Sequence, residues 1–126
     1  MKDYKLPLEV EGVTYTLMFD INVMQAIQEE YGSIKAWGDK VEDSDDGMDA
    51  KAVIFGFREM LNEGIDAENE GKSADEQRPE LSLRQVGRLV TKMGLTDASG
   101  KIQELVIQST KDDNPKNASS TKTKTQ

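Results

Sequence analysis

The feature that most constrains the fold is a change of hydrophobic period after residue 19. Up to that point apolar side chains alternate with polar ones, at Tyr4, Leu6, Leu8 and Val10 and then at Val13, Tyr15, Leu17 and Phe19. Such alternation is typical of strands with one buried face. A two-residue turn at Glu11-Gly12 pairs Val10 with Val13, Leu8 with Tyr15, Leu6 with Leu17 and Tyr4 with Phe19. A lone hairpin is marginal in water, so its apolar face is expected to pack on helices or on a second copy of the chain.

Beyond residue 19 the apolar residues recur at helical spacing. Capping signals divide this part into predicted helices at about residues 21–31, 34–42, 50–63, 83–93 and 98–109. Gly32, Gly64 and Gly94 are predicted to end three of them. The helix over residues 50–63 has the widest apolar stripe, which includes Val53, Phe57 and Leu61, so it is expected to be the most buried.

Three polar segments complete the chain. Residues 42–49 are acidic and predict a loop, and the almost wholly polar residues 66–80 predict a long mobile loop. In residues 111–126 the only apolar side chain is Ala118, which predicts a disordered tail. The sequence therefore predicts an α+β fold, mostly α, in which one domain (residues 1–110) packs an N-terminal hairpin on four to five helices.

The residue types that are missing exclude much chemistry. The chain has no His and no Cys, so it lacks an imidazole base, a Cys-His nucleophile pair and every metal site that uses those ligands. The acidic loop does not match a calcium loop, because Gly47 in sixth place puts Val53 where a bidentate Glu is required. No catalytic residue, cofactor or metal site is predicted, and a non-enzymatic protein is expected.

Charge and hydropathy limit the kinds of molecule that the chain is expected to bind. The 126 residues have a formal charge of −8, and residues 1–110 hold 12 basic and 22 acidic side chains, which gives −10. This balance argues against nucleic acid as a partner. The N-terminus has no apolar core of a signal peptide, and no apolar run approaches the ~20 residues of a membrane span. We expect a cytoplasmic protein without a membrane partner.

Apolar residues are the candidates for contact with another protein. They lie on the hairpin face, on the predicted buried helix and at the only tryptophan: Leu8, Tyr15, Leu17, Trp37, Val53, Phe57 and Leu61. Trp37 is either a core residue or an exposed anchor. Gly56 and Gly87 interrupt helices, which indicates close helix contact either within one protomer or at a subunit interface. Self-association is expected as well.

Two segments resemble a known family. NEGIDAENE (residues 62–70) and PELSLRQVGRLV (residues 79–90) are similar to the tail assembly chaperones of long-tailed bacteriophages and of prophages of Gram-positive bacteria. The hairpin followed by DINVMQAIQEEYGSIKAW is similar in kind to the start of those proteins, and the resemblance covers about residues 4–108. It depends on helix-capping phrases and the order of elements, and it transfers no active site.

The resemblance implies a role in tail morphogenesis. Such chaperones coat the largely helical tape measure protein, keep it soluble in the host cytoplasm, help recruit tail tube protein, and are absent from the mature virion. The family often makes a longer product by −1 frameshifting, and Pro115-Lys116-Asn117 is compatible with the slippery codons CCA AAA AAC. Reading the gene tests this hypothesis.

Two other functions stay open at this point. A phage tail tube or connector subunit would need a β-rich chain. An acidic inhibitor that mimics DNA would need carboxylates spaced along an ordered face, and it would compete with DNA for an enzyme.

Overall fold

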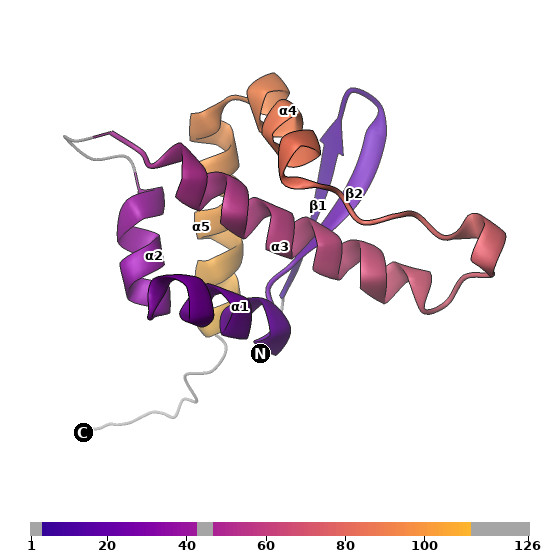
Figure 1. Ribbon diagram of the computed structural model, residues 1–126, viewed down its shortest axis with the longest axis horizontal. Helices are drawn as coiled ribbons and strands as arrows, with labels where there is room; N and C mark the ends of the chain where they lie inside the picture. The colour runs from indigo at the N-terminus through magenta and orange to yellow at the C-terminus, as the bar shows by residue number, and fades with distance from the viewer. Residues whose placement is uncertain (1–3, 43–46, 112–126) are drawn as a thin grey trace.

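The computed structural model describes residues 4–42 and 47–111. The elements follow in the order β1 (Lys5–Val10), β2 (Val13–Met18), α1 (Ile21–Tyr31), α2 (Ile34–Val41), α3 (Ala50–Asn69), a 3₁₀ turn η1 (Ala74–Glu76), α4 (Leu83–Met93) and α5 (Leu95–Lys111). The long α3 runs through the middle of the molecule and contacts β2 and the other four α-helices (Figure 1). The predicted class, a hairpin on a mostly helical fold, is confirmed.

The hairpin has the predicted register. Leu6 pairs with Leu17, Leu8 with Tyr15 and Val10 with Val13 in an antiparallel ladder. Glu11 and Gly12 both have positive φ, 51° and 84°, as a two-residue turn that follows strand twist requires. Beyond the ladder, the Phe19 N–H donates to the Tyr4 carbonyl at 2.9 Å, so the fourth predicted pair is also in contact. One face of this hairpin lies against α3.

Side-chain caps begin three helices at the predicted residues. The Asp20 carboxylate accepts from the Val23 N–H at 3.1 Å, and the Ser33 hydroxyl accepts from the Ala36 N–H at 3.0 Å. Ser82 and Gln85 form the predicted capping box at the start of α4. Because caps satisfy N–H groups that have no partner within the helix, these starts follow from local sequence.

The predicted end of α3 is wrong. The helix does not stop at Gly64 but continues to Asn69. A Cβ on Gly64 would collide with the main-chain carbonyl of Thr16, so this glycine lets β2 cross directly over the helix. The residue is required by a contact between distant segments and not by a helix stop.

The loop predicted over residues 66–80 is shorter than expected, since it begins after Asn69, and it is bonded to α3. Residues 66–69 belong to α3, and two asparagine side chains bind the rest of the segment to that helix. Asn69 donates to the Arg78 carbonyl at 2.7 Å and accepts from the Arg78 N–H at 3.0 Å. Asn62 makes the same pair of bonds with Leu81, at 3.0 and 2.7 Å. The return from α3 to α4 is therefore fixed at two points.

Two further boundaries differ from the prediction. α5 begins at Leu95 and not at residue 98, and only Gly94, with φ of 97°, separates it from α4. The Ala98 N–H bonds to the Gly94 carbonyl at 3.1 Å, so the same residue ends one helix and begins the next. α5 includes residue 111. The rest of the predicted disordered tail, and residues 43–46 of the predicted acidic loop, lie outside the described residues.

The core lies between α3, the hairpin and the other helices. α3 contributes more of it than any other element, as the width of its stripe predicts: Ala52, Val53, Gly56, Phe57, Met60, Leu61, Gly64 and Ile65 are all buried. The largest side chains enclosed with them are Trp37 and Phe19.

Candidate functional site

Six of the seven predicted contact residues lie in the core, which corrects the prediction that they form a contact surface. Leu8 is 6% exposed, and five others are 0–1% exposed: Leu17, Trp37, Val53, Phe57 and Leu61. They are apolar because they hold the hairpin and α2 against α3. A side chain with no exposed area makes no contact with a partner unless the fold opens.

Trp37 is the clearest case. Its indole N–H donates to the Ala52 carbonyl at 3.0 Å in the core, so its polar atom has a partner inside the protein. A Cβ on Gly56 would collide with the indole ring. Of the two interpretations offered by the sequence, Trp37 is a core residue and Gly56 serves close packing within one protomer.

Tyr15 is the only one of the seven that stays half-buried. The Arg78 guanidinium lies 5.1 Å from the centre of its ring and donates to the Thr14 carbonyl at 2.7 Å. Arg78, in the segment that returns from α3, therefore covers part of the Tyr15 ring, and the rest of the side chain offers little surface.

The surface holds a different candidate, a groove between α3 and α4 with a volume of about 820 Å³. On α3 it is lined by residues 51, 54, 55 and 58, and on α4 by residues 84, 87, 88 and 91, with Leu83 beside them. Each set has the spacing i, i+3, i+4, i+7, which places its members on one helix face. The groove is thus a trough between two helices, about two helical turns or ~11 Å long at 1.5 Å per residue. We refer to it as the α3–α4 groove.

The groove has an apolar floor. Ile54 and Phe55 are half-buried in it, and Leu83 is 50% exposed at its edge. Gly87 leaves the floor low, since a Cβ there would meet only the Ile54 Cδ1 at 3.8 Å, an ordinary contact. Phe55 packs edge-on against Tyr31, with ring centres 5.6 Å apart, and this contact holds it in place. Burial between these elements, together with Asp49 and Glu30, raises the pKa of the Tyr31 hydroxyl.

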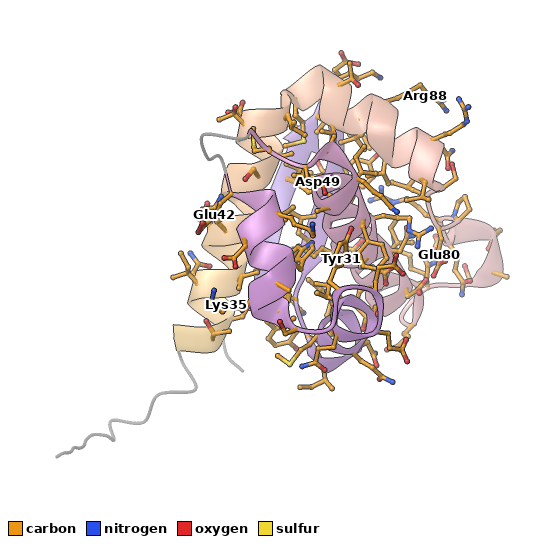
Figure 2. All side chains as sticks on the ribbon, turned by 60° about the vertical axis from the view of Figure 1, so that its left-hand side comes forward. Tyr31, Lys35, Glu42, Asp49, Glu80 and Arg88 are labelled. Atoms are coloured by element: carbon orange, nitrogen blue, oxygen red, sulfur yellow. The ribbon has the colours of Figure 1, made fainter. Side chains whose placement is uncertain are left out.

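Cations surround this floor. Lys51 and Arg58 stand on the α3 wall and Arg84 and Arg88 on the α4 wall, against one carboxylate, Glu30. Three of the four arginines of the whole chain are among them. Figure 2 shows Arg88 extending outward from α4, on the opposite side of the view from Glu42.

The sequence contained a signal for this groove that the apolar criterion missed. Arg84 and Arg88 are four residues apart, Lys51 and Arg58 are seven apart, and Gly87 lies between the first pair. Helical spacing therefore places each pair on one face. The pairing of α3 with α4, which joins the two faces into one groove, could not be read from spacing.

Two pairs of carboxyl groups lie farther along α3. A hydrogen bond with Asp20 and partial burial raise the pKa of Glu63 to about 7, although the Asn22 amide, which donates to Glu63 at 3.0 Å, opposes the shift. A hydrogen bond with Asp66, again with burial, raises the pKa of Glu80. Neither Glu63 nor Asp20 lines the α3–α4 groove. Glu80 and Asp66 do not line it either.

Within residues 4–42 and 47–111 no three acidic side chains come together as metal ligands. No helix in this described part is long and apolar enough to cross a membrane.

Comparison with known proteins found no match: no family model, no curated protein and no solved structure resembles the chain significantly.

Proposed function

We propose that this protein is a tail assembly chaperone that binds and solubilises a tape measure protein and helps recruit tail tube protein. It performs no catalysis, acts in the host cytoplasm and leaves before the virion is complete. The observation that carries this proposal is the α3–α4 groove, which leaves Leu83 half exposed above an apolar floor. An open trough between two helices fits the apolar face of a third helix.

The resemblance of residues 62–70 and 79–90 supports the same function. In the structure, these segments form the second half of α3 and the start of α4, together with the Asn62–Leu81 contact between them. The second segment contributes four residues to the lining of the groove: Leu83, Arg84, Gly87 and Arg88. An acidic exterior also suits a carrier that must keep a poorly soluble partner in solution.

The fold counts against the tail tube alternative. That function requires a β-rich chain, whereas the described residues contain two strands and five α-helices.

The test is co-expression of the full chain with the tape measure protein from the neighbouring gene. We expect a larger soluble fraction of that protein and its co-purification with the chain. The control is co-expression with an unrelated acidic protein of similar size. Equal solubility in both cases, together with failure to co-purify, would refute the proposal.

A further inference from the structure

The charge of the α3–α4 groove is opposite to that of the protein. The chain as a whole has 24 acidic and 16 basic side chains, but the groove has four basic side chains and one acidic one. A groove that served only to bury apolar surface would need no such reversal. The basic side chains on its walls therefore indicate the charge of the ligand that binds between them.

Three of the four cations have no acid partner among the described residues. Ion pairs in the described residues join Lys35 to Asp39, Arg58 to Glu59, Arg78 to Glu68 and Lys92 to Glu11. Lys51, Arg84 and Arg88 take part in none of them. These three side chains are exposed, so they are free to move toward a ligand.

Arg58 is only partly satisfied. Its Nη2 donates to the Glu59 carboxylate at 3.1 Å, while its Nε–H is enclosed without an acceptor among the described residues. A guanidinium presents five N–H donors in a planar fork that suits a carboxylate. Because the Nε–H is enclosed, the donors of this fork that remain available to a second acid are those of the terminal nitrogens.

From these observations we propose that the α3–α4 groove binds an acidic amphipathic helix of another protein. The apolar face of that helix lies on Ile54, Phe55 and Gly87, and its Glu or Asp side chains flank this face on both sides. Lys51 and Arg58 contact the acids on one flank, and Arg84 and Arg88 contact those on the other. The inference rests on the proposed function for the kind of partner, a helix, and on the groove for its chemistry.

The dimensions of the groove support a helix. A trough of about two turns accepts an apolar stripe at i, i+3, i+4 and i+7. The basic side chains stand on both walls, so they meet acids on the two sides of that stripe and not along its centre. Nucleic acid also carries negative charge, but an apolar floor with a half-exposed leucine offers a phosphate backbone nothing to bind.

The test uses the full chain and two fluorescent helical peptides. Both peptides have Leu at i, i+3, i+4 and i+7; one has Glu on both flanks and the other has Lys at the same positions. Fluorescence anisotropy measures binding. We expect the Glu peptide to bind roughly tenfold or more tightly than the Lys peptide, and its affinity to fall as salt is added.

Charge reversal identifies the residues. The double variant R84E/R88E is expected to weaken the Glu peptide about tenfold and to strengthen the Lys peptide, because two flanking pairs become repulsive in one case and attractive in the other. The matched control K35E/K40E makes the same change in net charge outside the groove and is expected to leave both affinities within about twofold. Equal effects of the two double variants would overturn the proposal.

A third variant blocks the groove without changing charge. Gly87→Met places a side chain on the floor of the trough and replaces a helical glycine with a better helix former, so the fold should be kept. Its thermal melt verifies this. We expect it to abolish binding of the Glu peptide, and binding at wild-type strength would overturn the proposal.

The remaining outcomes distinguish other occupants. Failure of the Glu peptide to bind, tighter binding of a DNA duplex than of the peptide, or a homodimer that R84E/R88E dissociates would each overturn the inference. None of these measurements uses the tape measure protein. Peptide binding without co-purification would thus refute the proposed function alone, and undiminished co-purification by Gly87→Met would refute the groove as the site for that protein.

Discussion

The glycines on the two sides of α3 differ in how closely other atoms cover them. On the side that faces α2 and the hairpin, Gly56 and Gly64 are covered, the first by the Trp37 ring and the second by the Thr16 main chain. On the side that faces α4, Gly87 of the neighbouring helix has only one side-chain atom near it, at 3.8 Å. The same residue type thus closes the packing on one side and keeps a groove open on the other.

This difference separates structure from function. Covered glycines permit contacts closer than any other residue allows, so their replacement costs stability. An uncovered glycine in a helix lowers stability because its backbone is flexible, and it permits no closer packing contact that would offset this cost. Gly87 is thus a candidate functional residue, because the space that it leaves is part of the α3–α4 groove. The following experiments test the comparison.

The largest effect is expected for Gly64→Ala. The added methyl group meets a main-chain carbonyl that cannot rotate away, so either β2 or α3 must shift, at a cost of roughly 3 kcal/mol or about 10 °C in melting temperature. The control is Gly100→Ala in α5, which meets nothing within 4 Å and should not destabilise the protein. Similar melting temperatures for the two variants would show that the crossing of β2 is not tight.

A smaller effect is expected for Glu63→Gln, and it grows as the pH rises from 5 to 8. The folded-state pKa of about 7 lies above the ordinary value of 4.5, so the folded state binds the proton more tightly than the unfolded state does. The resulting stabilisation is full below pH 4.5 and is lost as the pH rises through 7, where Glu63 ionises against Asp20 and Asp66.

The variant keeps a neutral donor at this position at every pH. We expect its melting temperature to exceed that of the wild type increasingly from pH 5 to pH 8. Thermal melts across this range measure the difference, with the exposed Glu29→Gln on α1 as the control. A constant difference between Glu63→Gln and the wild type would contradict the raised pKa.

The smallest effect is expected for Gly87→Ala, with the opposite sign to Gly64→Ala. Its Cβ has room beside Ile54, and the change removes the flexibility of a helical glycine, so stability should rise by about 0.5–1 kcal/mol. Thermal melts beside the wild type measure it. A loss of stability would mean that this side of α3 is as closely packed as the other.

Local sequence predicted most of the fold because most of its boundaries are local. The caps at Asp20, Ser33 and Ser82 bond to N–H groups three residues away, and the hairpin register follows from a two-residue turn. Gly64 shows the limit of such patterns. Like Gly32 and Gly94, it is followed within two residues by an apolar side chain, which is the pattern of a helix end. A glycine is needed there for a different reason, because a strand some fifty residues earlier crosses the helix at this point.

The site was harder to predict for a related reason. Apolar side chains were the predicted contact residues, but folding buries most large apolar side chains, and Trp37 and Phe57 lie in the core. What remained for the surface was a small apolar floor and the charges around it. Lys51 and Arg84 become neighbours only when α3 packs on α4, and that pairing depends on the whole fold.

The asparagine contacts at both ends of the return from α3 have a consequence for how this chain can change in length. Asn62 and Asn69 each bond to both main-chain groups of one residue, as a neighbouring strand would. Between the end of α3 and Arg78, the chain around η1 is exposed and makes few hydrogen bonds to the helix. Longer loops cost little in closure entropy when their ends are held. Residues 71–75 are therefore where this protein would accept an insertion, such as an epitope or a fused domain, without disturbing the groove.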